Sequence, residues 1–512
     1  MIYDVAIAGY GPTGMLAAIL LGRAGDRVVV LERYKSLYNL PRVGIVHDDV
    51  LRMFQEVGCL EKIGPATFFL PLYELSNKGR VLLSNEVATH ATHGHPEMTS
   101  IYQPAFEAEL DAIAKSIATI DVLQGETIVA LDQDAEGVTL ASESDAGQRV
   151  TRARYVIGAD GGNSFVRQAL GIAYDDLGFD QNWLVIDGRA TRVPRADLPL
   201  LRQFCEPEQP GMTMQMGPDH RRWSFMIFPG ESAEDAVTPA NVWRRLARPE
   251  GATPDEFELI RVVAYKFQSL MAQGWRKDRV FLAGDAAHQM PPFLAQGMCS
   301  GFRDAHNIAW KLDLVLKGLA TPSLLDSYER EREPNARATI VESMKVGQNV
   351  NERDPNKVRA RDAQLMALNE ARRNGTASAQ LIAFRVPGFA DGFIARTGEG
   401  AGQAFPQATV RRDGRTGLFD DIAGRGFMIL SRSGDPLSVL SPLDRQFWAA
   451  LGGSAVVLGA PGLIDESGDL THLMDALGCD VLIKRPDNYI YGTGARLADL
   501  PALVGRMREQ LA

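Results

Sequence analysis

A glycine-rich turn near the start of the chain constrains the fold more than any other feature. The spacing GxGxxG is formed by Gly9, Gly11 and Gly14. A strand-like run at 3–8 precedes this turn, and an apolar helical pattern at 13–24 follows it. In such a unit the first glycine makes the turn, the second lets backbone approach a pyrophosphate, and the third permits close helix packing. The sequence therefore predicts a βαβ unit that binds a dinucleotide.

An acidic residue at the end of the next strand supports the same prediction. The run at 27–31 is strand-like, and Glu32 ends it, where a carboxylate can hold a pair of ribose hydroxyls. An acid here disfavours a 2'-phosphate, although Arg33 lies beside it. This motif alone leaves FAD and NAD as alternatives.

Two later motifs also follow strand-like segments. YVIGAD at 155–160 ends in Asp160 and continues into GGNS, and RVFLAGDAA at 279–287 contains Gly284 and Asp285. A carboxylate at a strand end can accept hydrogen bonds from hydroxyl groups but repels a bare phosphate. Three motifs of this kind, spaced along one chain, favour FAD over NAD.

The order of the three motifs resembles that in the single-component FAD-dependent aromatic-ring monooxygenases. Within that class, HRRW at 220–223 and GMCSGFRDAHNIAWKL at 297–312 look most like the 3-(3-hydroxyphenyl)propionate hydroxylase branch. The C-terminal part resembles the thioredoxin-like domain of phenol hydroxylase relatives. The resemblance implies FAD as cofactor, NADH or NADPH and O2 as co-substrates, and a phenolic substrate such as a 3-hydroxyphenylpropanoate-like acid.

The resemblance also implies contacts with FAD. Asp285 would hold the ribityl or pyrophosphate portion, and Asp160 would serve both FAD and nicotinamide docking. Arg42 and Gln103 match positions that commonly contact the cofactor. The complete expected set of cofactor-binding residues is Gly9, Gly11, Gly14, Glu32, Arg33, Arg42, Gln103, Asp160, Gly284, Asp285, Pro292, Gly297 and Met298.

The loop after the third motif is expected to meet the flavin ring. Pro292 lacks a backbone donor and can form a rigid wall. Gly297 should open a long helix containing 302–317, whose positive end would stabilise an anionic reduced flavin. Two residues depart from the family pattern, since Ala295 stands where many relatives have glycine and Cys299 where many have asparagine. These departures affect the expected loop geometry, and Cys299 is interpreted as a small packing residue.

The reaction implied by the resemblance needs no protein nucleophile. Hydride transfer would reduce FAD, oxygen would form a C4a-hydroperoxide, and this would hydroxylate a ring activated by its own phenol group. A base that helps to deprotonate the phenol would assist the reaction. His47 and Asp49, shortly after Arg42, are the candidates for that base.

The expected fold class is α/β. It comprises a Rossmann-like FAD-binding domain (GR2-type), an inserted antiparallel β-sheet substrate domain and a C-terminal thioredoxin-like domain. The expected boundaries are FAD-binding domain 1–175, β-rich substrate domain 176–272, second part of the FAD-binding domain 273–345, helical connection 346–395 and thioredoxin-like domain 396–512.

Composition argues against several kinds of partner. The formal net charge is -10 without a basic cluster, which disfavours nucleic acid. No apolar run is long enough for a membrane-spanning helix. The four cysteines are widely spaced, so a cytoplasmic protein is expected. No metal site is expected, and the appended domain is compatible with a homodimer.

Several side chains receive structural interpretations. Met214 and Met216 should pack in the core or in the β-rich roof, as should Trp223 and Phe225. His288 should be structural or cofactor-adjacent. We expect His90, His93 and His95 to lie in a solvated loop, and Arg330 and Arg332 to form pairs on a helix surface.

Two alternative functions share the same motifs. The chain could hydroxylate a polyketide or antibiotic phenol, in which case bulky fused-ring phenols would be turned over. It could also be a noncatalytic FAD-binding redox sensor, which substrate-stimulated oxidation of NAD(P)H would exclude. Flavin-dependent halogenation is disfavoured because the sequence contains no WxWxIP segment.

Overall fold

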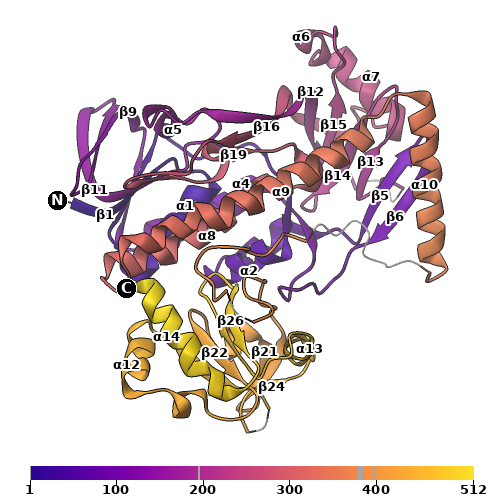
Figure 1. Cartoon of the computed structure of the whole chain (residues 1–512). Helices are drawn as coiled ribbons and strands as arrows, with labels where there is room; N and C mark the ends of the chain where they lie inside the picture. The colour runs from indigo at the N-terminus through magenta and orange to yellow at the C-terminus, as the bar shows by residue number, and fades with distance from the viewer. Residues whose placement is uncertain (1, 194–196, 377–384, 397, 460) are drawn as a thin grey trace.

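A mixed sheet with a parallel centre forms the first layer of the molecule. Figure 1 shows the chain as a computed structural model that describes residues 2–193, 197–376, 385–396, 398–459 and 461–512. The sheet has the order β17-β18-β11-β1-β2-β8, and β9 and β10 extend from β11. Its strands are β1 (Ile2–Ala8), β2 (Val28–Glu32), β8 (Ile120–Gln124), β9 (Thr127–Gln133), β10 (Val138–Ser144), β11 (Gly147–Gly158), β17 (Arg276–Lys277) and β18 (Val280–Leu282). Strands from both ends of the first 282 residues therefore share one sheet.

A second sheet, called here the roof sheet, is largely antiparallel. Its order is β19-β16-β12-β15-β14-β13-β5-β6. The strands are β5 (Leu72–Asn77), β6 (Arg80–Glu86), β12 (Tyr174–Ala190), β13 (Leu201–Phe204), β14 (Gly211–Met216), β15 (His220–Met226), β16 (Phe257–Ala272) and β19 (His288–Gln289). The sequence missed β5 and β6, which precede the expected β-rich range and reach this sheet through parallel pairing of β5 with β13.

Helices connect the two sheets and surround the first. They are α1 (Pro12–Ala24), α2 (Asp48–Glu56), α3 (Leu60–Ile63), α4 (Gln103–Ser116), α5 (Phe165–Ala169), α6 (Ala233–Ala236), α7 (Pro239–Glu250), α8 (Gly297–Leu316), α9 (Ser327–Val350) and α10 (Pro355–Arg373). A small sheet of β3 (Ile45–His47), β4 (Thr67–Phe69) and β7 (Met98–Ile101) lies between them in sequence. The expected helix at Gly297 is confirmed. Part of the expected connection, residues 377–384, lies outside the described residues.

Close packing of α8 against α1 depends on small residues. A Cβ added at Gly301 would lie 2.4 Å from the Thr13 hydroxyl and 3.2 Å from the Gly284 Cα. The two helices can therefore approach only because Gly301 has no side chain. This contact joins the first and third glycine motifs.

The C-terminal part forms a thioredoxin-like sheet, as the sequence predicted. The sheet has the order β23-β22-β25-β26, with β22 and β23 parallel and the remaining pairs antiparallel. Its elements are β22 (Met428–Ser431), α12 (Pro442–Ala450), β23 (Ser454–Val457), α13 (Asp469–Ala476), β25 (Val481–Lys484), β26 (Ile490–Gly494) and α14 (Leu500–Leu511). A smaller sheet contains β20 (Thr409–Arg412), β21 (Arg415–Leu418) and β24 (Ile464–Asp465), with α11 (Phe419–Ile422) after β21.

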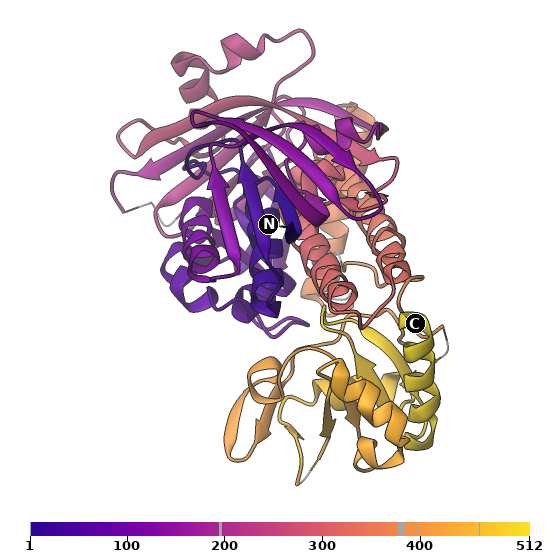
Figure 2. The same cartoon turned by 90° about the vertical axis from the view of Figure 1, so that its left-hand side faces the viewer.

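The C-terminal part docks on the side of α2 and α8 that faces away from the roof sheet (Figures 1 and 2). A buried charge network joins them. Glu331 on α9 accepts hydrogen bonds from Lys311 and from Arg485, both at 2.7 Å. Arg485 also pairs with Asp487 at 2.6 Å. These side chains are almost fully buried, so the loss of one would leave uncompensated charge in the interface.

The interpretation of Arg332 as a helix-surface residue is wrong. Arg332 is fully buried and bonds to Asp304 at 2.9 Å, so it does not form a helix-surface pair. Its partner on α8 approaches only in the folded chain, whereas Arg330, two residues earlier, is exposed as expected. His288, expected to be structural or cofactor-adjacent, bonds to the other oxygen of Asp304 at 2.8 Å in the same buried cluster.

No helix among the residues that the structure describes is long and apolar enough to cross a membrane. Within the same described ranges, no group of three or more His, Cys, Asp or Glu is arranged to hold a metal ion.

Candidate active site

The three glycines of the first motif have different surroundings. Gly9 has a φ of +97°, and a Cβ there would lie 2.5 Å from the Ala159 carbonyl oxygen. A Cβ at Gly14 would lie 2.2 Å from the Gly9 carbonyl oxygen. At Gly11, by contrast, no atom lies within 4 Å of the added carbon. Gly11 thus faces open space at the N-terminus of α1, where a pyrophosphate is favoured.

Most of the expected cofactor-binding residues line one cavity of about 310 Å³ beside this turn. Those that line it are Gly9, Gly11, Glu32, Arg33, Arg42, Gln103, Asp160, Asp285, Gly297 and Met298. The other three expected residues are near it in sequence but do not line it. Gly14 and Gly284 are buried in the packing of α1 and α8, and Pro292 is exposed at the start of the following loop.

Glu32 is held at the cavity by backbone groups. Its two carboxylate oxygens accept hydrogen bonds from the amides of Tyr10 at 2.7 Å and Tyr34 at 2.9 Å. A carboxylate has about four acceptor positions, so ribose hydroxyls could still donate to it. Arg33 is exposed, with its guanidinium 5.0 Å from the centre of the Tyr34 ring.

Asp285 has the features of a ligand for hydroxyl groups. It lies in the short helix η2 (Gly284–Ala286), and its side chain is exposed to the cavity. No hydrogen bond to its carboxylate is formed within the described residues. It can therefore accept donors from a polyhydroxyl chain such as ribityl. Together with the open space at Gly11, this free carboxylate fits FAD.

Asp160 and Gln103 instead use their polar atoms within the protein. The Asp160 carboxylate accepts from the Ser164 hydroxyl and from the Val166 amide, which fixes the start of α5. The Gln103 side-chain oxygen accepts from the amides of Arg42 at 2.8 Å and Val43 at 2.6 Å. These two residues therefore hold the backbone of the cavity wall in position. The sequence motifs did not indicate this role.

The loop after the third motif leads into the N-terminus of α8. It contains the short helix η3 (Pro292–Leu294) and then Ala295, which has a φ of +54°. This left-handed conformation costs a non-glycine residue about 1–2 kcal/mol, which explains why glycine is common here. Gly297 and Met298 open the helix and leave free backbone amides at its positive end.

The face of the roof sheet that meets this loop carries buried methionines and Gln203, beside the buried pair of Arg222 and Asp187. Met214 and Met216 are buried there, as predicted. A Cβ added at Gly44 would lie 1.9 Å from the Met214 methyl carbon, so this side chain reaches down to the loop that carries Arg42. On β13, Gln203 donates to the Phe293 carbonyl at 3.2 Å, and its own side-chain oxygen is buried without a partner.

Alternate side chains of the HRRW run make contacts on opposite faces of the roof sheet. Arg222 pairs with buried Asp187 at 2.6 Å and donates to the carbonyls of Pro41 and Arg42, which holds this loop under the sheet. Trp223 packs on the other face, edge-on against Phe257 with ring centres 5.0 Å apart. The predicted packing of Trp223 and of Phe225 is confirmed.

His47 and Asp49 lie at the start of α2 and face a different cavity, between α2, α8 and the C-terminal part. The His47 ring bonds to the Leu294 carbonyl at 3.2 Å, and burial lowers the pKa of its imidazole. Burial alone would raise the pKa of Asp49, but its bond to Arg303 at 2.5 Å outweighs this and holds the pKa at about 2. Asp49 is therefore a weak base, while a catalytic role for His47 stays a prediction.

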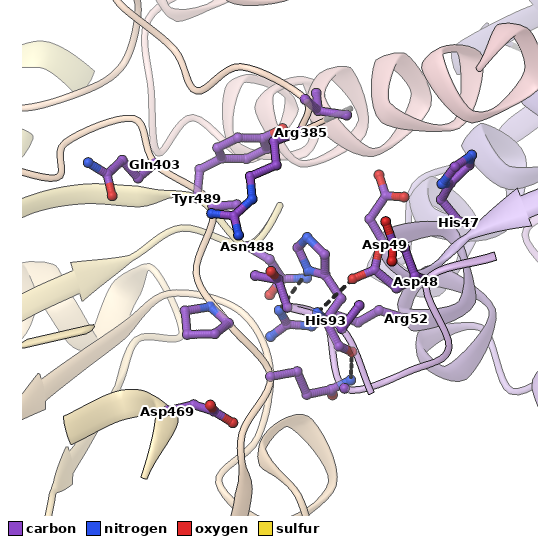
Figure 3. A pocket seen from close by; sticks show the side chains of 18 of the residues that line it. His47, Asp48, Asp49, Arg52, His93, Arg385, Gln403, Asp469, Asn488 and Tyr489 are labelled. Carbon is purple, nitrogen blue, oxygen red and sulfur yellow. Dashed lines mark hydrogen bonds between the residues drawn. The ribbon is translucent and has the colours of Figure 1, made fainter. Parts of the chain in front are cut away.

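This second cavity also corrects the interpretation of the histidine-rich loop. His95 is buried and its ring bonds to Gln55 at 2.9 Å, while the His93 amide donates to Asp48 at 2.9 Å. Figure 3 shows His93 between Asp48 and Arg52. The loop is packed against α2 and the C-terminal part instead of being solvated, although His90 is exposed. Contacts from residues far along the chain could not be recognised in the sequence.

Fold and site together define an FAD-dependent aromatic monooxygenase, which uses a reduced nicotinamide and O2. Residues 2–343 match the family described as FAD binding domain, and residues 402–510 match the HcaD C-terminal domain. The chain belongs to this FAD binding domain family.

Relatives with assigned names are similar over almost the whole chain. A "Probable NADH-specific resorcinol 4-hydroxylase" of Rhodococcus jostii (strain RHA1) is 41% identical, covering 99% of this chain and 95% of that protein. A "3-(3-hydroxy-phenyl)propionate/3-hydroxycinnamic acid hydroxylase" of Mycobacterium avium (strain 104) is 32% identical, covering 98% and 91%.

Solved structures share the complete fold. The flavin-dependent monooxygenase PieE, in complex with FAD and substrate, has a TM-score of 0.83 at 21% identity, covering 100% of this chain and 99% of that one. The anhydrotetracycline hydroxylase OxyS of Streptomyces rimosus has a TM-score of 0.76 at 27% identity, covering 97% and 96%.

Proposed function

We propose that this enzyme hydroxylates a single-ring phenol that carries a second substituent meta to its hydroxyl group. Resorcinol is the first choice, and a 3-hydroxyphenylpropanoate-like acid is the second. The names of the two relatives support this proposal, because both describe substrates with this meta pattern. The higher identity to the resorcinol enzyme favours resorcinol and, as its name states, NADH.

The packing of the roof sheet is the observation that carries the choice of a small ring. Met214 reaches the backbone of Gly44, and together with Met216 it fills space between the sheet and the loop of Arg42. A bulky fused-ring substrate would require these buried side chains to move, which is costly in a packed interior. A single ring requires less displacement.

Gln203 supplies the polar contact that such a ring would need. Its side-chain oxygen is buried and without a partner, although its amide nitrogen is fixed on the Phe293 carbonyl. An unsatisfied buried acceptor costs about 1–3 kcal/mol, which a phenol hydroxyl donating to it would recover. We therefore propose that Gln203 orients the phenol hydroxyl beside the loop at Pro292.

The protein residues have three tasks in this proposal. Bound FAD supplies hydride acceptance and oxygen activation. Asp285, Gly11 and Glu32 hold the cofactor, and the N-terminus of α8 stabilises negative charge at the ring end. The roof sheet excludes water and orients the phenol. We further propose a cytoplasmic setting, in line with four free, buried cysteines among the described residues.

Product analysis tests this proposal. The FAD-loaded enzyme is given NADH and oxygen with resorcinol, 3-(3-hydroxyphenyl)propanoate or a fused-ring phenol, and each product is identified by mass. We expect resorcinol to accelerate NADH oxidation most and to gain one oxygen atom. Turnover of the fused-ring phenol alone would transfer the assignment to the polyketide-type alternative. Oxidation of NADH without any oxygenated product would refute the proposed function.

A further inference from the structure

The cavity between the FAD-binding part and the C-terminal part has a volume of about 870 Å³, which suits an organic ligand. Figure 3 shows its two walls. His47, Asp48 and Asp49 come from one side, whereas Gln403 and Tyr489 come from the other. Among the described residues, the two cavities share no lining residue. They come closest in sequence at Gln296, which lines this cavity, and Gly297, which lines the flavin cleft.

Arg303 on α8 lines this cavity with unused donors. Arg303 is only 4% exposed, and its Nε donates a hydrogen bond to the Asp49 carboxylate. The two terminal nitrogens, Nη1 and Nη2, are buried and have no hydrogen-bond partner. One carboxylate oxygen of Asp49 is likewise unpartnered. A buried guanidinium remains charged, and leaving its donors unsatisfied is costly, so this position favours a ligand with acceptor oxygens.

The shape of the free donors selects a carboxylate. With Nε committed to Asp49, the remaining Nη1 and Nη2 present the end of a planar fork, which matches two oxygens of one carboxylate. Asp48 also faces this space, and burial followed by repulsion from Asp49 raises its pKa to about 6. Asp48 can therefore take up a proton readily when a further negative charge enters. Arg385 contributes positive charge to the same lining.

The remainder of the ligand would meet an aromatic wall. Phe389 and Tyr489 both line the cavity and stack on each other, with ring centres 3.9 Å apart and an interplanar angle of 29°. Tyr489 interacts electrostatically with Arg303, so the wall stands near the guanidinium. The aromatic ring of a ligand could stack on these two rings while the ligand's carboxylate binds the Arg303 guanidinium.

We propose that this interdomain cavity is a binding site for a small aromatic carboxylate, held by Nη1 and Nη2 of Arg303 beside the Phe389 and Tyr489 rings. The site is additional to the flavin cleft, and its ligand does not depend on which phenol is hydroxylated. Resorcinol, which has no carboxylate, would not satisfy Arg303 in the same way.

Ligand-observed NMR on the FAD-loaded enzyme tests the site without relying on activity. The probes are benzoate and 3-phenylpropanoate, with benzamide as the neutral match to benzoate. We expect both acids to bind and benzamide to bind at least about tenfold more weakly, since a charge-assisted pair is lost. Equal binding of benzoate and benzamide, or no binding of either acid, would overturn the proposal.

Variants locate the bound acid. The double variant Arg303→Gln with Asp49→Asn removes both charges together and avoids an unpaired buried charge. Thr92→Trp fills the cavity from its exposed rim and keeps Arg303. Both variants should weaken benzoate binding at least about tenfold, whereas Gln203→Leu, at the roof sheet, should not. Unchanged affinity in both cavity variants, with FAD content and circular dichroism intact, would overturn the assignment.

Discussion

The two cavities of this enzyme are built in opposite ways. The flavin cleft also draws on distant segments, between Ala8 and Met298, but its glycines and carboxylates stand in short motifs at the ends of strands. The interdomain cavity combines α2, α8, the loop at His93 and the C-terminal part, which are far apart in the sequence. Backbone geometry dominates the first cavity, and buried charge dominates the second. Changes to these two regions should therefore fail in different ways.

The largest expected effect lies at the interdomain charge network. Glu331→Gln removes the charge that faces Lys311 and Arg485, and should lower the free energy of unfolding by about 3–5 kcal/mol. The matched control is Glu333→Gln, whose partner Arg337 lies in a more exposed pair and whose loss should cost under about 1 kcal/mol. Denaturation curves followed by intrinsic fluorescence measure both. Equal losses would show that the network does not stabilise the interface.

A second pair of variants separates cofactor binding from folding in the first cavity. Gly11→Ala adds a carbon in open space, so the apoprotein should keep its Tm while its affinity for FAD falls about a hundredfold through loss of close approach. Gly9→Ala forces a side chain at φ +97° against the Ala159 carbonyl and should lower the Tm itself. Flavin titration and thermal melts of the apoproteins distinguish them. A stable Gly9→Ala apoprotein with normal affinity would contradict the description of the turn.

Acid should weaken the interdomain region before the flavin cleft. Burial, followed by the charge of Arg52, lowers the pKa of His93 and of His95 to about 4. The unfolded chain binds these protons near pH 6.5, so stability is present above that pH and is lost as the pH falls from about 6.5 to about 4. The loss should be at most on the order of 3 kcal/mol per histidine. His93→Asn with His95→Asn should flatten this part of the pH profile, and an unchanged slope would assign it to other groups.

The smallest predicted effect concerns the roof sheet. Gln203→Leu removes the unpartnered acceptor and keeps a similar volume, so the Kd for the phenol should rise about tenfold. The affinity for FAD should stay unchanged, because Gln203 does not line the flavin cleft. Fluorescence titration with resorcinol measures the Kd for the phenol, and flavin release measures the affinity for FAD. A loss of FAD without weaker phenol binding would place Gln203 in cofactor binding instead.

The predictability of each residue follows from the range of its contacts. The glycine turn and the helix at Gly297 depend on local patterns, and the sequence predicted both, while the thioredoxin-like unit followed from the family resemblance. Arg332 and His95 were misjudged because their partners, Asp304 and Gln55, approach only through tertiary packing. Such pairings cannot be predicted from the residues that neighbour each side chain in the sequence.

Within the expected site, a residue's position in a motif did not determine which contacts its side chain makes. Gln103 and Asp160 were found by their positions in family motifs, yet their side-chain oxygens bond to neighbouring protein groups. Gln203 and Arg303 were missed as functional candidates because neither stands in a glycine motif. Their buried side-chain atoms without a hydrogen-bond partner can be recognised only in the folded structure.

The most direct test of this account is a crystal structure of the FAD-loaded enzyme with resorcinol bound. We predict the ring between the roof sheet and the loop at Pro292, with one hydroxyl within hydrogen-bond distance of the Gln203 side-chain oxygen. Resorcinol bound beside Arg303 in the interdomain cavity, with Gln203 unpartnered, would contradict the proposed division of work between the two cavities.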